Sequence, residues 1–392
     1  MSARSWVRAW VVAAVAAVAF GCGGSDTPPG SLPDPADAPA RLFAVDSLGS
    51  TDGDDSFGLI VDVALSPEGS LAVSQYGMGE VWVFDAQGRR RVVGRSGGGP
   101  GEFGSVPRVA WRGDTLLVVE GVPSRVSLMA TDGRYLRGHA TVPRSAAARY
   151  GPVGYLRSGL TVAAPRTTSS STPEPKPILL VGTEGQILDT LGEARHRRVS
   201  ADAALPNGRG FVFLNPLANY TRTELSPDGR YFGTADELEG PDGSELQFVL
   251  YDAAGNELGR TAVGVETDPA SDEDVLERAG DIVESLSTRH GLPVASVRKS
   301  ILEAVQAPDR LPALSRFLVD NAGNLWVGSI VKGGRVFWRA WNIEGDLVRT
   351  WIADPDLELK QIHDGAAVAV RRDDVRGWRV VFVRPNAEEN SH

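Results

Sequence analysis

The sequence predicts an all-β fold built from repeated four-stranded units, and three observations lead to this prediction. Residues 81–94 (VWVFDAQGRRRVVG) place aromatic and valine side chains at the period of two that a half-buried strand requires, around a tight turn ending at Gly88. The same strand–turn–strand order recurs along the chain, mostly with glycine again at the turn. A two-stranded hairpin cannot bury its apolar face alone. The copies must therefore pack against one another, as the blades of a β-propeller do.

The N-terminal segment predicts a lipoprotein signal peptide at residues 1–21. Two arginines precede an apolar run at residues 9–20, which is too short to span a membrane. The run leads into Ala19-Phe20-Gly21-Cys22, which resembles a bacterial lipobox and implies lipidation of Cys22. An ordinary secretory signal with an incidental cysteine is the alternative. Gly23, rather than aspartate, follows the cysteine, so we favour an outer-membrane anchor in the cell envelope, with the protein periplasmic or surface-facing.

The rest of the chain divides into a tether, a ring of blades and a short tail. Residues 22–40 are rich in Pro, Gly, Ser and Asp and predict a flexible tether. A six-bladed propeller is predicted at residues 41–385, followed by a C-terminal tail at 386–392. The predicted blades are residues 60–95, 106–140, 153–192, 221–264, 314–351 and 359–385. We expect residues 41–49 to supply the fourth strand of blade six and so close the ring. Seven blades would require a degenerate blade within residues 195–217.

One insertion between blades four and five predicts helices. Ser271 followed by three acidic residues is typical of a helix N-terminus, and apolar residues then fall on one helical face. Gly291 ends this helix and Pro293 suits the start of a second one. We therefore predict an α-helical hairpin at about residues 271–306. It is either a packed decoration, which we favour, or a lid over one face of the ring.

Two motifs are similar to those of bacterial six-bladed propeller proteins related to NHL-repeat and TolB-like propellers. They are GGGPGEF at residues 97–103 and FLVDNAGNLWVGS at residues 317–329. The resemblance covers roughly residues 41–385 and implies a fold, but it implies no activity, because propellers serve as platforms, lyases, lactonases and scaffolds. The glycine-rich motif has no helix behind it and no Lys-Ser/Thr after it, so we interpret it as an interblade turn rather than a phosphate loop.

One set of polar residues recurs at a fixed position on the innermost strands. The residue seven before the inner-turn glycine is Asp62 in blade one, Arg222 in blade four and Arg316 in blade five, and Arg108 is equivalent in blade two if one deletion is allowed. Innermost strands line the central channel, so these side chains are expected to ring one level of it. Three guanidiniums and one carboxylate there would bind a carboxylate or phosphate group. The alternative is that they pair with one another and face channel water.

Composition narrows the function further. The formal net charge of the 392 residues is -10, which argues against a nucleic-acid partner. No catalytic motif is present, and the five histidines lack metal-binding spacing, so we expect no cofactor; calcium at the acidic run of residues 52–55 is the alternative. We therefore predict a membrane-anchored binding module for a protein or an anionic small molecule.

Two enzymatic classes are weighed against this prediction. A lactonase-like hydrolase or lyase would hold a divalent cation in the channel, but the inner positions are largely arginine instead of acidic. A propeller-gated peptidase would need a catalytic domain, for which the chain has no room.

Overall fold

The computed structural model describes residues 39–49, 56–104, 107–121, 124–166, 175–195, 200–215, 217, 220–240, 243–305, 307–331, 335–363, 365–373 and 377–386. The predicted signal peptide, Cys22, nearly all of the tether, the acidic run at residues 52–55 and nearly all of the C-terminal tail lie outside these ranges. No helix in the described ranges is long and apolar enough to cross a membrane.

Four sheets of four antiparallel strands each account for most of the first two thirds of the fold. The first sheet contains β2 (Ile60–Leu65), β3 (Leu71–Gln75), β4 (Val81–Phe84) and β5 (Arg90–Val93). The second contains β8 (Pro107–Arg112), β9 (Thr115–Glu120), β10 (Arg125–Met129) and β11 (Tyr135–Ala140). The third contains β12 (Tyr150–Tyr155), β13 (Thr161–Pro165), β14 (Lys176–Val181) and β15 (Ile187–Ala194). The fourth contains β18 (Arg222–Leu225), β19 (Tyr231–Gly240), β20 (Gly243–Asp252) and β21 (Glu257–Val265).

The last part of the chain forms one eight-stranded sheet together with the N-terminal strand. Its strands, in spatial order, are β22 (Arg316–Val319), β23 (Leu325–Ile330), β24 (Val336–Trp341), β25 (Leu347–Ala353), β1 (Ala40–Leu48), β28 (Gly377–Pro385), β27 (Ala366–Asp373) and β26 (Leu357–His363). Strand β1 pairs antiparallel with β28, as the sequence predicts, and its first two residues also pair parallel with β25.

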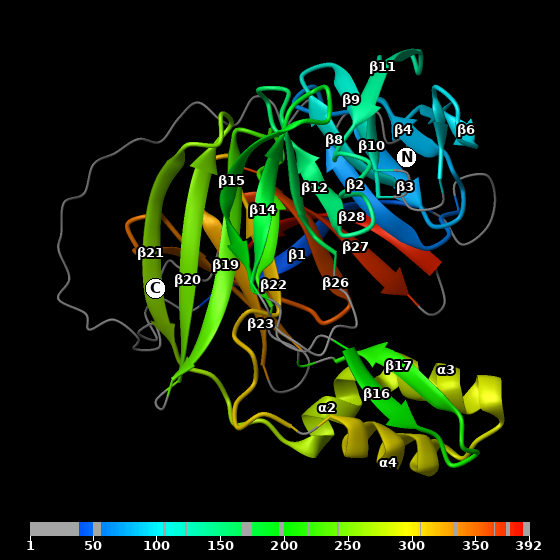
Figure 1. The fold of residues 1–392 in the computed structure, drawn as a ribbon, viewed down its shortest axis with the longest axis vertical. Helices are drawn as coiled ribbons and strands as arrows, with labels where there is room; N and C mark the ends of the chain where they lie inside the picture. The colour runs from blue at the N-terminus through cyan, green and yellow to red at the C-terminus, as the bar shows by residue number, and fades with distance from the viewer. Residues whose placement is uncertain are drawn as a thin grey trace.

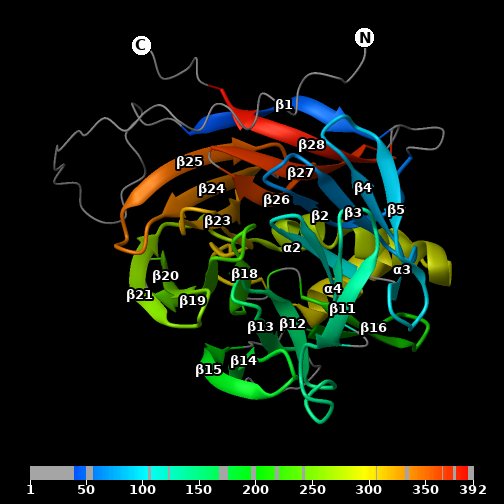
Figure 2. The same ribbon diagram turned by 90° about the horizontal axis from the view of Figure 1, so that it is seen from above.

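The sheets are arranged in a ring, as in a propeller (Figure 2). Their first strands contact one another in the order β8, β2, β26, β22, β18 and β12, and β12 contacts β9. Large apolar side chains fill the spaces between and within the sheets, among them Trp326 and Trp338, which are buried. The indole of Trp111 on β8 also donates a hydrogen bond to the carbonyl of Ala64 on β2, 3.1 Å away. Neighbouring sheets are thus joined by both packing and polar contacts.

The N-terminal strand contributes to the core through Leu42. We expect Leu42→Ala to lower the free energy of unfolding by about 2–4 kcal/mol, because the substitution leaves a cavity in a close-packed cluster. Leu42 is 2% exposed and lies in the cluster that contains Trp338 and Trp351. The adjacent Phe43, on the opposite face of β1, is 46% exposed. Phe43→Ala is the matched control and should cost less than about 1 kcal/mol. Equal losses in denaturant titrations would contradict a closing role for β1.

A small subdomain lies below the ring in the view of Figure 1. It contains the hairpin β16 (Ser200–Ala204) and β17 (Gly210–Leu214) and the helices α2 (Asp272–Arg278), α3 (Gly280–His290) and α4 (Val294–Ala304). Apolar side chains of both parts form one core, which includes Phe213, Val275, Val297 and Ile301. The hairpin at residues 200–214, part of the segment considered above as a degenerate blade, therefore packs on the helices.

The helical insertion differs in detail from the predicted hairpin. Ser271 caps α2 as predicted: its hydroxyl accepts a hydrogen bond from the Asp274 amide, and the Asp274 carboxylate accepts one from the Ser271 amide. The expected first helix is divided at Ala279, which is the C-cap of α2 and the N-cap of α3. Gly280, a poor helix former, follows this break. The helix α3 ends at Gly291 in the left-handed conformation, with φ of 61°.

Candidate functional site

A cavity of about 470 Å³ lies along the middle of the ring and is lined mainly by the first strands of the sheets. Its size is within the range of small-molecule sites. The charged side chains that line it are Asp62 from β2, Arg108 and Arg112 from β8, Arg222 and Glu224 from β18, Arg316 from β22, and Glu358 and Lys360 from β26. All four residues predicted from the sequence are therefore brought to one cavity. Five cationic and three acidic side chains give its wall a formal excess of two positive charges, in a chain whose net charge is -10.

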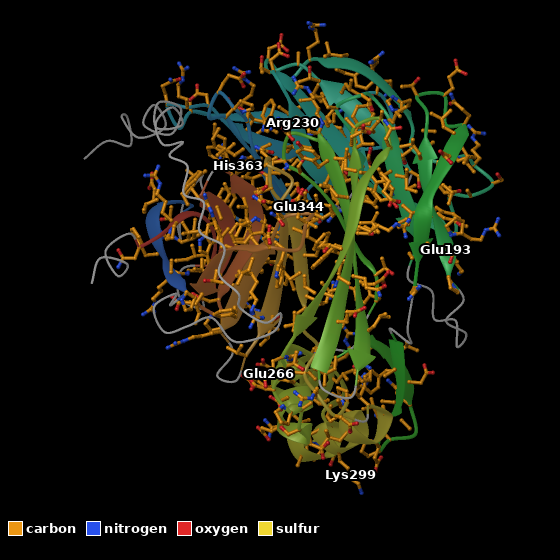
Figure 3. The ribbon with its side chains drawn as sticks, turned by 90° about the vertical axis from the view of Figure 1, so that its left-hand side faces the viewer. Glu193, Arg230, Glu266, Lys299, Glu344 and His363 are labelled. Carbon is orange, nitrogen blue, oxygen red and sulfur yellow. The ribbon has the colours of Figure 1, made fainter. Side chains whose placement is uncertain are left out.

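The two ends of the cavity differ in what surrounds them. Arg222 and Arg316 are the first residues of β18 and β22. Each of these strands follows one part of the subdomain in the chain, β18 the hairpin and β22 the helices, and runs away from it. Figure 3 shows Arg230, in the turn after β18, and His363, the last residue of β26, far from Glu266, which follows β21, and from Lys299 on α4 of the subdomain. The end of the cavity that holds Arg222 and Arg316, here called the arginine end, therefore faces the subdomain. Pro312 and Leu314, between α4 and β22, line the cavity at this end.

Arg316 forms part of a three-membered ion-pair chain. Its Nη1 lies 3.2 Å from Oε1 of Glu358, and Nζ of Lys360 lies 2.9 Å from the same oxygen. Lys360 also donates a hydrogen bond to the Val61 carbonyl, 3.2 Å away. Burial alone would raise the pKa of Glu358, but Lys360 and Arg316 hold it below its usual value. One carboxylate thus serves two cations, which leaves this group with a net positive charge.

Arg222 has a different environment, without a carboxylate partner. Its guanidinium donates a hydrogen bond to the Tyr220 hydroxyl and lies over the Tyr220 ring, 3.9 Å from the ring centroid. No carboxylate of the described residues lies within ion-pair distance, and its buried Nε–H has no acceptor. Burial lowers the pKa of Arg222, and the nearby Arg316 lowers it further. Arg222 and Arg316 thus lie near each other at this end. The carboxylate beside Arg316 is that of Glu358, which Arg316 shares with Lys360.

A third group of charged side chains in the cavity contains Asp62 of β2, Arg108 of β8 and Glu224 of β18. The Asp62 carboxylate accepts hydrogen bonds from the amides of Val63 and Val109, both at 3.0 Å, and the second of these joins β2 to β8. Arg108 donates to the Val153 carbonyl at 3.1 Å; burial acts to lower its pKa, but Glu224 and Asp62 raise it above its usual value. Burial raises the pKa of Glu224, against the opposing effect of Arg108, and Asp62 adds to the rise.

Arg112 lies at the other end of the cavity, where it links three sheets. Its guanidinium donates hydrogen bonds to the carbonyls of Trp111, Tyr155 and Pro227. Burial lowers the pKa of Arg112 to about 10, so the side chain remains charged at neutral pH. Since both terminal nitrogens of Arg112 already donate to carbonyl oxygens, this side chain is primarily a structural link between β8, β12 and the turn that follows β18.

Sequence reasoning missed four charged residues of the wall, although signals for three of them were present. Counting seven residues back from Gly365, the inner-turn glycine between β26 and β27, leads to Glu358 by the rule that gave Arg222 and Arg316. Glu224 follows Arg222 by two residues and so shares its face of the strand. Lys360 follows Glu358 in the same way, across a register shift in β26, and Arg112 ends the strand that carries Arg108.

No group of three or more His, Cys, Asp or Glu side chains in the described ranges is placed to hold a metal ion. The three acidic residues of the cavity have the partners given above. The donor set is therefore dominated by N–H groups, which suit an anionic ligand.

Comparison with known proteins gives distant similarities. No protein-family model and no curated protein matches the chain. Similar solved structures include a putative exported protein from Bacteroides fragilis, with 12% identity and a TM-score of 0.46 over 90% of this chain and 98% of that one. A calcium-binding protein, regucalcin, from Agrobacterium tumefaciens has 12% identity and a TM-score of 0.37 over 87% and 96% of the two chains. A virginiamycin B lyase from Staphylococcus aureus has 10% identity and a TM-score of 0.37 over 89% and 90%.

These identities and scores give no basis for transferring an activity to this chain. The predicted relationship to NHL-repeat and TolB-like propellers stays a prediction.

Proposed function

We propose that this protein is a six-bladed propeller that binds an anionic small molecule at the arginine end of its channel. The blade count rests on dividing the eight-stranded sheet at β1. This strand pairs with β28 from Leu42 to Leu48, but with β25 only at Ala40 and Arg41. Strands β22–β25 are then blade five, and β26–β28 with β1 are blade six. From the sequence evidence given above, the proposal also includes lipidation of Cys22 and a location in the cell envelope.

The observation that carries the proposal is the uncompensated charge at Arg222. A guanidinium that is partly removed from water loses hydration, and this cost is offset when it pairs with an anion. Arg222 lies beside Arg316 and has an aromatic ring and a hydroxyl as its contacts instead of a carboxylate. A ligand carboxylate, phosphate or sulfate between the two guanidiniums would supply the missing charge and accept forked hydrogen bonds.

A cation-dependent hydrolase or lyase is less consistent with this wall. A divalent cation would have to enter a cavity that holds five cationic side chains. It would also have to displace the amides held by Asp62 or the ammonium and guanidinium groups held by Glu358. No feature of the cavity therefore favours the enzymatic alternative.

We expect Arg222→Met and Arg316→Met each to weaken binding of organic anions by about tenfold or more, because each removes one charged fork while keeping the apolar stem. Calorimetric titration with succinate and with glycerol phosphate would measure the effect. Arg134→Met is the matched control, since Arg134 lies in an outer turn with its side chain 68% exposed, and it should bind as the unchanged protein does. If the channel variants and the control bind these anions equally well, the proposed site is wrong.

A further inference from the structure

Glu224 is placed to sense the charge of whatever occupies the arginine end of the cavity. Arg222 and Glu224 are two residues apart on β18, so both side chains face the cavity at a spacing of roughly 7 Å along the strand. The Glu224 carboxylate accepts a hydrogen bond from the adjacent Leu225 amide, at 3.3 Å. No cation in the described part of the chain lies within ion-pair distance of it. Arg108 acts on this carboxylate electrostatically, from beyond that distance. An anion beside Arg222 would therefore meet a carboxylate that is not directly paired with a cation.

We propose that Glu224 makes anion binding in this channel proton-coupled: its carboxyl group takes up a proton when an anion occupies the space beside Arg222. This inference rests on the proposed anion site. At roughly 7 Å and an effective dielectric constant of about 20, two like charges repel by enough to change an affinity more than tenfold. Protonation of Glu224 removes that repulsion. Affinity for an anion should therefore rise as the pH falls.

The other charged groups of the cavity do not reproduce this effect. Arg108, Arg112, Arg222, Arg316 and Lys360 are the cations facing Glu224 from β8, β18, β22 and β26. Asp62 and Glu358 are the other carboxylates, and each is held by donors: Asp62 by two amides, and Glu358 by Arg316 and Lys360. His363 lies behind the lining residue Gln361, with Nε2 3.1 Å from its Oε1, and is the histidine to test separately.

The direction of the pH dependence follows from linkage. Burial has already raised the pKa of Glu224 in the free protein, and a bound anion raises it further. The bound form then holds more protons than the free form between these two pKa values. Affinity increases as the pH falls through that interval, which begins above the ordinary value of a glutamate, and becomes constant at pH values below it.

Sulfate is the appropriate probe, because its charge stays constant across the interval in which a carboxylate or phosphate would itself titrate. We expect the affinity of the full chain for sulfate to rise by about tenfold or more between about pH 8 and about pH 5. Glu224→Gln keeps the shape of the side chain and the oxygen that accepts from Leu225. It should bind sulfate at about pH 8 as tightly as the unchanged protein does at about pH 5, with a nearly flat profile.

Three comparison variants make the outcomes distinct. Glu184→Gln, in an exposed outer turn, and His363→Asn should both keep the steep profile. Calorimetry in two buffers of different ionisation enthalpy should detect proton uptake in the unchanged protein and none in Glu224→Gln. Two results would overturn the proton coupling alone. One is sulfate binding that is lost in Arg222→Met but does not depend on pH in the unchanged protein. The other is a pH dependence that persists in Glu224→Gln. Absence of sulfate binding at every pH, or binding unaffected by Arg222→Met, overturns the anion site and the coupling together.

Discussion

Asp320→Ala is expected to lower the free energy of unfolding by about 3–5 kcal/mol, because it removes a buried carboxylate that holds both a turn and a core indole. Asp320 is 7% exposed and lies in the turn between β22 and β23. Its Oδ1 accepts hydrogen bonds from the amides of Ala322 and Asn324, and its Oδ2 accepts from the Asn324 side chain and from Nε1 of Trp326, all at 2.9 Å. Trp326 is 1% exposed, so its indole N–H would be left without water or an acceptor.

The chain contains a matched control for this substitution. Residues 252–256 repeat the pattern D-x-A-G-N of residues 320–324, and Asp252 likewise accepts from the amides of Ala254 and Asn256 and from the Asn256 side chain. This second turn is partly exposed and holds no indole. Asp252→Ala should therefore cost no more than about 1–2 kcal/mol by chemical denaturation. Similar losses in the two variants would show that the Trp326 contact contributes little.

The same turn explains one of the two motifs that suggested a family. In FLVDNAGNLWVGS, the Asp320 carboxylate accepts hydrogen bonds from the side chains of Asn324 and Trp326. The glycine at position 323 has φ of 86°, which other residues resist. The motif therefore specifies an inner turn and its anchorage in the core. Its turn and tryptophan, within residues 320–329, are accounted for by folding and do not line the cavity, whereas the three apolar residues before the turn, Phe317, Leu318 and Val319, do.

The repeat and the channel residues could be predicted because both depend on local rules. A strand of period two and an inner-turn glycine recur from sheet to sheet, so counting back seven residues from Gly229 and Gly323 placed Arg222 and Arg316 at one level, while Arg108 needed one deletion. The closing of the eight-stranded sheet by residues 40–48 was predictable from a missing outer strand.

The subdomain could not be predicted in the same way, because its contacts are non-local. The turn between β16 and β17 carries Asn207-Gly208, an ordinary hairpin signal. What the hairpin packs against is determined by helices, the first of which begins at Asp272, well after β17 ends at Leu214. Likewise, Glu358 and Lys360 became a group with Arg316 only once β26 was placed beside β22. Sequence offsets identify which side chains face the channel, but they do not identify which of these pair.

The second motif, GGGPGEF, leads to the other large expected effect. The loop is held by a buried ion pair at the ends of β9 and β10: Nε of Arg125 lies 2.5 Å from Oε2 of Glu120, with the two side chains 18% and 2% exposed. Arg125 also donates to the carbonyls of Gly98 and Glu102, and the Gly104 amide donates to Glu120 at 2.6 Å. The glycine carbonyls thus point at a cation of the protein itself, which a phosphate-binding loop would not require.

Arg125→Met should therefore destabilise the protein by about 3–5 kcal/mol, because it leaves the Glu120 carboxylate buried without its countercharge and releases the loop. Combining it with Glu120→Gln removes the uncompensated charge and should restore at least about 1–2 kcal/mol of this loss. Arg95→Met is the control: Arg95 pairs with Glu102 of the same loop, but its side chain is 79% exposed, so the cost should stay below about 1 kcal/mol. Unfolding curves in which Arg125→Met behaves like Arg95→Met would mean that the loop holds its conformation without this pair. A double variant less stable than Arg125→Met would mean that the Glu120 carboxylate is satisfied by the Gly104 amide alone.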